Sequence, residues 1–105
     1  MGIFSMLFGK GKKNEEVVNV IKNGAFLVDV RTSAEFSGGS VKGAINIPLN
    51  QVQSQLSKFK AKKGVVVFCA SGNRSAQAKR ILEGNGIQNV YNGGSWSKVN
   101  RLVNS

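Results

Sequence analysis

The sequence contains no histidine, and cysteine and proline occur once each in 105 residues. Without histidine, the chain cannot form a Ser-His-Asp triad, a Cys-His pair or an imidazole metal ligand. A single cysteine, Cys69, excludes an internal disulfide, a C-x-x-C redox pair and a zinc site built from several thiolates. Only five acidic residues are present, which disfavours a carboxylate metal cage or a glycosidase pair. We therefore expect no metal and no cofactor, and the remaining chemistry is that of one thiol or simple binding.

Positive charge is in large excess, because 15 lysines and arginines against five acids give a net charge of +10. A field of that size favours anionic partners. The alternative interpretation is that scattered lysines keep a small domain in solution. Four lysines cluster before a predicted strand, but Phe59 is the one aromatic residue among them, which makes a poor platform for stacking bases. These lysines are Lys58, Lys60, Lys62 and Lys63. Nucleic acid is therefore an unlikely partner.

The first 13 residues consist of an apolar run, MGIFSMLF, followed by GKGKK. The run is too short to span a bilayer, which takes about 20 apolar residues. It lacks the features of a signal peptide, and Met6 stands where the myristoylation pattern needs a hydroxyl residue. We expect residues 1–13 to be a flexible tail with at most weak membrane contact. The domain is expected to occupy residues 14–105, in the cytoplasm.

A chain of 105 residues fits one domain. Along it, segments with the hydrophobic pattern of strands alternate with segments that have the hydrophobic spacing of helices. Continuous apolar, β-branched runs predict strands buried on both faces. Strands are expected at 25–30, 44–48, 64–69 and 88–91. Helices are expected at 15–23, with Asn14 as the cap, and at 33–36, 50–60, 76–83 and 95–103. This alternation predicts an α/β fold with a small, mostly parallel sheet and helices on both faces.

The stretch VVVFCASGNRSAQAKRIL places Cys69 between a buried strand and a helix. Open α/β sheets bind ligands at the carboxyl ends of their strands, and a helix start presents unpaired N–H groups. If the loop curls around the sulfur, its amides stabilise a thiolate that is open to solvent. Gly72 permits the turn, Arg74 offers a forked donor to an oxyanion, and Ser75 can cap the helix or donate to the sulfur. The alternative interpretation of Cys69 is a small core hydrophobe.

The loop CASGNRS resembles the active-site loop of rhodanese-like domains, Cys-x-x-Gly-x-Arg-Ser. Three further segments agree in order and spacing: LVDVRTSAEF (27–36), GSVKGAINIP (39–48) and NVYNGGSWSKV (89–99). The resemblance covers the chain from about residue 14 to its end. It implies the rhodanese fold and a single-domain sulfurtransferase. In that family the cysteine takes a sulfane sulfur from a donor such as thiosulfate, becomes a persulfide, and passes the sulfur to cyanide or a thiol.

By this resemblance, Cys69 is the catalytic nucleophile and persulfide carrier. The outer sulfur would be bound by the loop amides, with Arg74 helping to place the anion. The residues of this predicted substrate site are Ala70, Ser71, Gly72, Asn73, Arg74 and Ser75. The charges of Asp29, Arg31 and Glu35 match the family's Asp-Val-Arg…Glu-Phe signature and are interpreted as structural, as is Trp96. Ser40 departs from the family, which usually has histidine there, and the neutral loop side chains predict weak activity toward thiosulfate.

Two other functions fit parts of the pattern. A thiol phosphatase or arsenate reductase of the same fold needs a wide loop around a tetrahedral oxyanion, whereas four residues separate Cys69 from Arg74. A non-enzymatic persulfide carrier or interaction module, loaded by a partner protein, would keep the cysteine without turning over small substrates. The expected partners of the enzyme are a small anionic sulfur donor and a thiol or cyanide acceptor, with a sulfur-relay protein as a further candidate.

Overall fold

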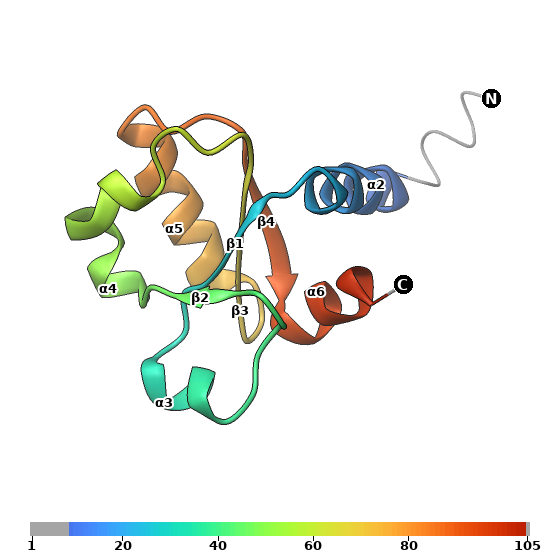
Figure 1. The fold of residues 1–105 in the computed structure, drawn as a ribbon, viewed down its shortest axis with the longest axis horizontal. Coiled ribbons are helices and arrows are strands. Elements are labelled where there is room, and N and C mark those ends of the chain that lie inside the picture. Colours follow the sequence, from blue (N-terminus) through green and yellow to red (C-terminus); the bar gives the residue numbers. More distant parts are fainter. Residues whose placement is uncertain (1–8, 105) are drawn as a thin grey trace.

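A computed structural model of the chain describes residues 9–104. Within this part of the chain, four parallel strands form one sheet in the order β2-β1-β3-β4 (Figure 1). The strands are β1 (Phe26–Asp29), β2 (Ile45–Asn46), β3 (Val65–Cys69) and β4 (Val90–Ser95). The helices are α2 (Gly9–Lys22), α3 (Ser33–Ser37), α4 (Leu49–Val52), α5 (Asn73–Gly84) and α6 (Trp96–Val103), with a 3-10 helix, η1 (Gln53–Lys58), directly after α4.

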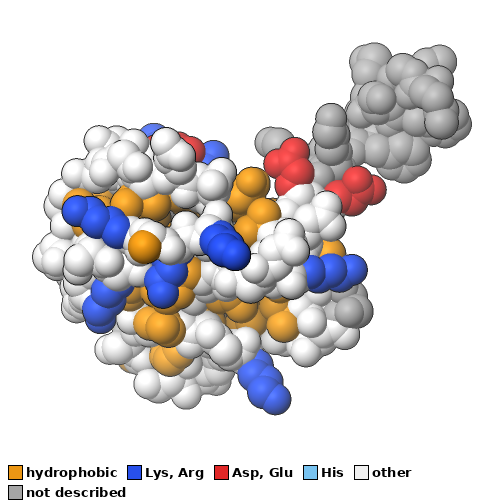
Figure 2. All heavy atoms as spheres, turned by 45° about the horizontal axis from the view of Figure 1, so that its top comes forward, with side chains coloured by type: hydrophobic (Ala, Val, Ile, Leu, Met, Phe, Trp, Pro, Cys, Tyr) orange, Lys and Arg blue, Asp and Glu red, His pale blue; other side chains and the backbone are white. Residues whose placement is uncertain are grey.

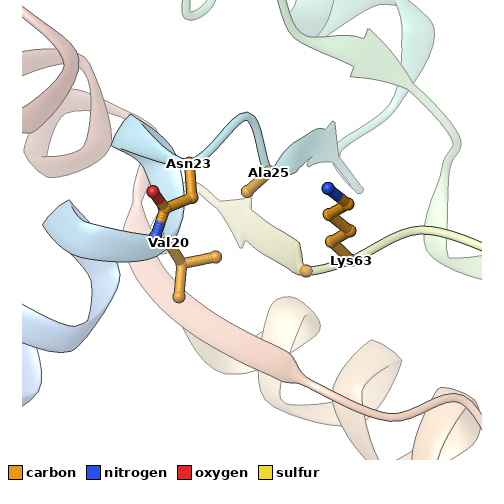
Figure 3. A pocket seen from close by; sticks show the side chains of 5 residues that line it. Val20, Asn23, Ala25 and Lys63 are labelled. Carbon is orange, nitrogen blue, oxygen red and sulfur yellow. The ribbon is translucent and has the colours of Figure 1, made fainter.

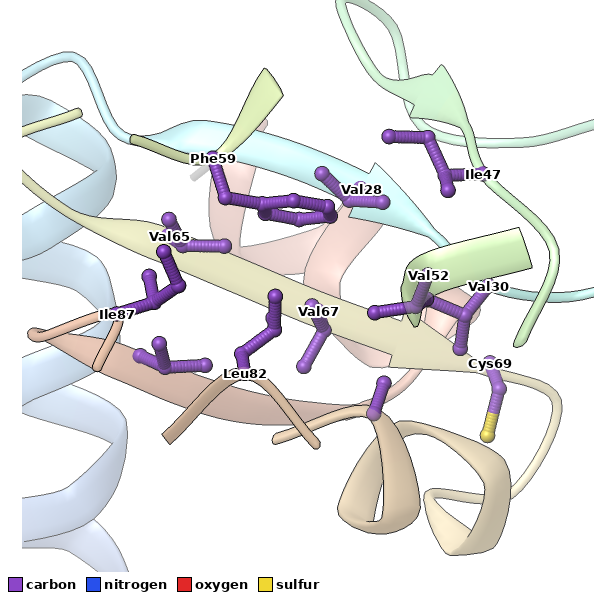
Figure 4. Close-up of a cluster of buried hydrophobic side chains, with 12 residues drawn as sticks. Val28, Val30, Ile47, Val52, Phe59, Val65, Val67, Cys69, Leu82 and Ile87 are labelled. Carbon is purple, nitrogen blue, oxygen red and sulfur yellow. The ribbon is translucent and has the colours of Figure 1, made fainter. Parts of the chain in front are cut away.

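The inner strand β3 is buried along its whole length because its side chains alternate between two hydrophobic clusters. Val65, Val67 and Cys69 belong to one cluster (Figure 4). Val66 and Phe68 belong to the other. A continuous apolar run of this kind is typical of a parallel strand covered on both sides. Cys69 thus ends the strand on the face that α5 covers.

Helices cover both faces of the sheet, with α4, η1 and α5 on one side and α2 and α6 on the other (Figure 1). Leu82 of α5 is fully buried in the first cluster. Val17 of α2 and Val99 of α6 are buried in the second. The predicted α/β architecture with helices on both faces is therefore confirmed. None of the helices within residues 9–104 is long and apolar enough to cross a membrane.

Helix α2 starts before the predicted position. The prediction that a helix begins after a cap at Asn14 is wrong, because α2 already begins at Gly9. Asparagine followed by two acids has the pattern of a helix start, but lysines before it are good helix formers and extend the helix at little cost. Residues 9–13 of the predicted tail therefore belong to α2. Residues 1–8, and the expected membrane contact of the tail, lie outside the described residues.

The predicted helix over 50–60 is two short helices of different type. Helix α4 ends at Val52 and η1 follows, with Gln55 at φ −121° and ψ 30°. Val52 and Phe59 are nevertheless buried in the first cluster, and Leu56 packs against it. Apolar spacings of three and four residues fit an α-helix and a 3-10 helix alike, so the pattern identified the buried face and not the helix type.

Strand β4 lies further along the chain than the predicted strand over 88–91. It contains Gly93 and Gly94, which were expected to open the last helix. Val67 pairs with Asn92 but Phe68 pairs with Gly94, so the strand carries a bulge at this point. Bulges insert an extra residue, and glycine is favoured where backbone or side chains approach closely. A Cβ on Gly93 would lie 2.6 Å from Val99 Cγ2, which explains the glycine.

The other elements differ from the predicted bounds only at their ends, where helices and strands are least well defined by sequence. Strand β2 keeps two of the five residues expected at 44–48, and β1 keeps four of the six expected at 25–30. Helix α5 begins three residues before the expected position, at Asn73. That earlier start brings the first turn of α5 into the loop after Cys69.

The lysine cluster before β3 does not form an aromatic platform. Phe59 is buried, and its ring packs edge-on against Phe26 with centroids 5.6 Å apart. The Lys62 ammonium lies 4.7 Å from the Phe26 ring centroid. Figure 2 shows lysine and arginine side chains scattered over the viewed face. These contacts favour a structural role for the cluster over base stacking.

Candidate active site

Cys69 lies at the point where the chain order of the sheet reverses. The chain runs from β1 outward to β2, then returns past β1 to form β3 and β4. Ligands of open α/β sheets bind outside the carboxyl ends of the strands at such a point. Asp29 ends β1 and pairs in register with Phe68, so the ends of β1 and β3 lie side by side. The sequence-predicted location of the site is the one the fold provides.

The loop after Cys69 curls back so that main-chain donors face the sulfur. The Gly72 amide lies 3.0 Å from Cys69 Sγ, and the Ser75 amide lies 3.4 Å from it. The Ser75 hydroxyl oxygen is also 3.4 Å from the sulfur. Gly72 has φ +100°, in the left-handed region that favours glycine. A Cβ on Gly72 would lie 3.4 Å from the Gly94 Cα, so the loop packs closely against β4.

The other loop residues were predicted to bind the outer sulfur of a persulfide and not Sγ itself. The amide of Ser71 also lowers the pKa of the Cys69 thiol. Within residues 9–104, the amides of Ala70, Asn73 and Arg74 make no hydrogen bond to the sulfur. The side chains of Ala70, Ser71 and Asn73 are exposed. Their proposed contact with an outer sulfur atom stays a prediction.

The Cys69 sulfhydryl is buried, and the prediction that it is open to solvent is wrong. The residue is 1% exposed, because the loop and the first turn of α5 close over it. Burial raises the pKa of the Cys69 thiol, but the Ser75 hydroxyl and the amides of Ser75, Ser71 and Gly72 outweigh burial. The pKa is therefore below its ordinary value. Inward-facing donors distinguish this cysteine from an inert core residue.

Arg74, which was expected to help place an anionic donor, forms an ion pair with Glu35. Nη1 lies 2.7 Å from Oε1, and Nη2 lies 3.1 Å from Oε2. Hydrogen bonds from Arg74, and then from the Thr32 amide, lower the pKa of Glu35 to about 2. The pair with Glu35 raises the pKa of Arg74. Both side chains are about one third exposed, so the pair lies at the mouth of the site.

Glu35 is held in place by the start of α3. Thr32 caps that helix by accepting a hydrogen bond from the Glu35 amide, at 3.2 Å. In return, Glu35 Oε1 accepts from the Thr32 amide at 3.0 Å, which completes a capping box. The sequence interpretation of Glu35 as mainly structural did not include its contact with Arg74.

The buried ion pair of Asp29 and Arg31 fits the structural interpretation. Arg31 Nη2 lies 2.7 Å from Asp29 Oδ2, and the guanidinium stacks 5.0 Å from the Trp96 ring centroid. Arg31 also donates to the Gly39 carbonyl. The Ser40 hydroxyl donates to Asp29 Oδ2 at 2.6 Å. Serine thus supplies a hydrogen bond to this pair at the position where histidine is usual.

Asn92 is a site residue that the sequence interpretation missed. Its Nδ2 donates to the Gly72 carbonyl at 3.1 Å, and its Oδ1 accepts from the Ser75 hydroxyl at 2.7 Å. Oδ1 also accepts from the Gly94 amide at 2.9 Å. Asn92 therefore joins β4 to the loop and to the first turn of α5. Its place directly before Gly93, in the segment NVYNGGSWSKV, was the available signal.

A groove beside Arg74 leaves space next to the loop. Its volume is about 460 Å³, and most of its wall is apolar. It runs between α4 and α5 past Val30, Leu49 and Ile81. A separate hollow near Lys63 and Val20 lies at the amino end of β3, opposite Cys69 (Figure 3). The groove, unlike that hollow, is lined by a residue of the loop after Cys69, Arg74.

The sequence profile of the rhodanese-like domain matches residues 13–101 of the chain. The chain belongs to the rhodanese-like domain family. This rhodanese-like chain is 39% identical over 74 residues to the thiosulfate sulfurtransferase PspE of Escherichia coli (strain K12), covering 69% of this chain and 71% of PspE. It is 40% identical over 68 residues to the uncharacterized protein YqhL of Bacillus subtilis (strain 168), covering 65% of this chain. The match takes in 54% of YqhL, so the chain spans about half the length of that relative.

The fold comparison agrees with the sequence comparison. The human single-domain sulfurtransferase TSTD1 superimposes with a TM-score of 0.67 at 28% identity. The match covers 81% of this chain and 89% of TSTD1. The rhodanese fold implied by the sequence resemblance is thereby confirmed, and Cys69 stands in the loop on which that resemblance depended.

Proposed function

We propose that this rhodanese-like domain is a sulfurtransferase that moves sulfane sulfur through a persulfide on Cys69. The donor is thiosulfate or another persulfide, and the acceptor is cyanide or a thiol. The observation that carries the proposal is the inward orientation of the Gly72 and Ser75 amides around the sulfur. Donors fixed in this way stabilise the charge on a thiolate and then on a persulfide without reorganisation during the reaction.

In the first step, the Cys69 thiolate attacks the sulfane sulfur of the donor. A new bond joins Sγ to that sulfur, and the old sulfur–sulfur bond breaks with its electron pair remaining on the leaving group, which is sulfite when the donor is thiosulfate. The negative charge then lies on the outer sulfur of the persulfide. The ionised form of Cys69 needs no general base for this step, and the hydrogen bonds to Sγ favour that form by lowering the pKa of Cys69.

In the second step, the acceptor attacks the outer sulfur and the bond to Sγ breaks. Cyanide leaves as thiocyanate, whereas a thiolate acceptor leaves as a persulfide, and the Cys69 thiolate is restored in both cases. Because Cys69 is 1% exposed, both reactants gain access only when the loop shifts outward. We place the reaction in the cytoplasm, where the reducing environment keeps a lone thiol available.

A persulfide carrier loaded by a partner protein is the second candidate function. The observation that favours it is the ion pair between Arg74 and Glu35, which removes the free cation expected to bind a small anionic donor. A carrier needs a protected sulfur, and the covered thiol fits that need. The two functions differ in whether free thiosulfate loads Cys69 and whether cyanide unloads it.

Intact-mass spectrometry after incubation with thiosulfate tests the proposal, because one cysteine makes the adduct unambiguous. We expect a mass gain of one sulfur atom that dithiothreitol removes, together with thiocyanate formation when cyanide is added. Cys69→Ala should retain its thermal unfolding transition and lose both signals. Loading only from a protein persulfide would favour the carrier, and sulfur transfer by Cys69→Ala would overturn both functions.

A further inference from the structure

The Ser75 hydroxyl lies between two groups that compete for its proton. Its oxygen is 2.7 Å from Asn92 Oδ1 and 3.4 Å from Cys69 Sγ. A serine hydroxyl has a single proton to donate, and its lone pairs only accept. Ser75 can therefore donate either to Asn92 or to the sulfur at one time, but not to both.

The hydrogen-bond partners of Asn92 fix the direction of its amide group. The Gly94 amide can only donate, so the atom that faces it must be the oxygen Oδ1. The Gly72 carbonyl can only accept, so the atom that faces it must be Nδ2. Both constraints give the same orientation. Oδ1 consequently faces Ser75 as an acceptor, and the hydroxyl proton of Ser75 lies toward Asn92.

The donors around Sγ together lower the pKa of Cys69, but the competition for the Ser75 proton limits how far the hydroxyl contributes to this lowering. With a thiol, the sulfur donates to the Ser75 oxygen, which donates to Asn92, and every group is satisfied. With a thiolate, the Ser75 hydroxyl either presents its lone pairs to the negative sulfur or turns to donate to it. If the hydroxyl turns toward the sulfur, Asn92 Oδ1 loses its hydrogen bond from Ser75 and keeps the one from the Gly94 amide. Either arrangement costs one hydrogen bond, so Asn92 opposes full solvation of the thiolate.

We propose that Asn92 is a positioning residue that acts through Ser75: it competes with the Cys69 thiolate for the hydroxyl proton, and this competition ends when the persulfide forms. The second half of this statement rests on the proposed function, because the charge leaves Sγ for the outer sulfur in that reaction. The neutral inner sulfur then needs no donor, and the Ser75 hydroxyl returns to Asn92. The thiolate is thereby raised in energy relative to the persulfide, which favours sulfur uptake.

A double-mutant cycle isolates this effect from the structural effect of Asn92. Asn92→Ala removes the competitor for the Ser75 proton and also the clamp on the Gly72 carbonyl. In a Ser75→Ala background, Asn92→Ala still removes the hydrogen bond to the Gly72 carbonyl. No hydroxyl proton is present in that background, so Asn92 and the sulfur do not compete for one. The difference between the two backgrounds therefore reports the hydroxyl alone. Asn92 is exposed, so its substitution does not open the core.

The measurement is the rate of iodoacetamide alkylation against pH in wild type, the two single variants and the double variant. With one cysteine in the chain, this rate reports the ionisation of Cys69 alone. The change in the pKa of Cys69 that Asn92→Ala causes in wild type should be more negative, by about half to one pH unit, than the change that it causes in the Ser75→Ala background. Equal changes in both backgrounds would overturn the proposal.

The limiting alkylation rate at high pH supplies a second readout that does not depend on sulfur transfer. A thiolate of lower pKa is a weaker nucleophile. Asn92→Ala should therefore react roughly two- to threefold more slowly than wild type once Cys69 is fully ionised. An unchanged or faster limiting rate would contradict the stated role of the hydroxyl.

Asn92→Asp separates the role of Asn92 from general loosening of the site. The carboxylate keeps the acceptor for Ser75 and Gly94 but adds a negative charge near the sulfur, which should raise the pKa of Cys69. The opposite signs expected for aspartate and alanine exclude loosening, which would shift both variants in one direction. Four other charged groups near the site are common to all variants: Arg74, Glu35, Asp29 and Arg31. Lys98 of α6, beside Gly94, is also unchanged.

Discussion

The guanidinium of Arg74 is bound by the carboxylate of Glu35, which lies 39 residues earlier in the chain. The pair places two opposite charges at the mouth of the site, where a single positive charge was expected. An anionic donor that approaches Cys69 therefore meets an arginine whose charge is already matched. Under the proposed function, we expect this ion pair to weaken the binding of thiosulfate.

Glu35→Gln should improve the use of thiosulfate. Glutamine also satisfies a capping box, so α3 keeps its start while the site loses one negative charge. The KM for thiosulfate should fall roughly threefold, as expected for one partly exposed charge. The measurement is cyanide–thiosulfate turnover, with Glu83→Gln on α5 as the matched loss of an exposed acid. A higher KM in Glu35→Gln would show that the carboxylate is needed to orient Arg74.

Arg74→Ala should weaken thiosulfate binding more than binding of a neutral thiol acceptor. The substitution leaves Glu35 unpaired at the mouth, where it repels a dianion. We expect kcat/KM for thiosulfate to fall roughly tenfold. The double variant with Glu35→Gln should recover part of the loss, because the uncompensated charge is then absent. Equal losses for thiosulfate and thiol would mean that Arg74 supports the loop instead of the anion.

The ion pair between Glu35 and Arg74 should make the folding stability of the domain depend on pH in the acid range. The pKa of Glu35 is lowered in the folded state to about 2 from an ordinary value of 4.5. Its contribution to folding is therefore full above about pH 4.5 and disappears as the pH falls through about 2. Urea unfolding across this range should show wild type more stable than Glu35→Gln above the window and indistinguishable below it. A difference that persists at the lowest pH would contradict this assignment.

Local composition was sufficient to predict that four strands exist and that Cys69 ends one of them, but not the bounds of β2 and β4. The run from Val65 to Cys69 is apolar and β-branched, and such a run folds as a buried parallel strand in most contexts. The position of the proposed nucleophile then follows, because the end of that strand is directly followed by a loop and the start of a helix. The sequence motifs went beyond the order of strands and helices and predicted the rhodanese fold, which the comparison with TSTD1 confirms.

The contacts around the sulfur could not be predicted in the same way. Ser75 and Asn92 are 17 residues apart, and they meet because β4 pairs with β3 through a bulge. The burial of Cys69 depends on how tightly the loop closes, which depends in turn on the approach of Gly72 to Gly94. These features arise from tertiary packing, and no local pattern of residue types encodes them.

Ser40→Ala should destabilise the domain and leave the chemistry of Cys69 unchanged. The Ser40 hydroxyl donates to the buried carboxylate of Asp29, which retains its bonds to Arg31. Loss of one hydrogen bond to a buried charged group costs about 1–3 kcal/mol. Chemical unfolding measures this cost, with the exposed Ser37→Ala as a control expected to stay within about 0.5 kcal/mol of wild type. A changed alkylation pKa in Ser40→Ala would link Asp29 to the sulfur site.

Gly72→Ala tests whether the curl of the loop lowers the pKa of Cys69. Gly72 and Gly86 both have positive φ, at +100° and +84°, so alanine is strained at either position. Each substitution should cost about 1 kcal/mol or more in stability. At Gly86 a Cβ meets nothing within 4 Å, whereas at Gly72 it would lie 3.4 Å from the Gly94 Cα.

The two variants should therefore differ at the sulfur and not in the size of their backbone strain. In Gly72→Ala the amide moves from its position 3.0 Å from Sγ, so the pKa of Cys69 should rise and persulfide formation should slow roughly tenfold. Gly86→Ala should show wild-type alkylation and sulfur loading at equal loss of stability. If both variants load sulfur at the wild-type rate, the amides around Cys69 do not support the reaction, because the one that lies nearest would have been displaced without effect.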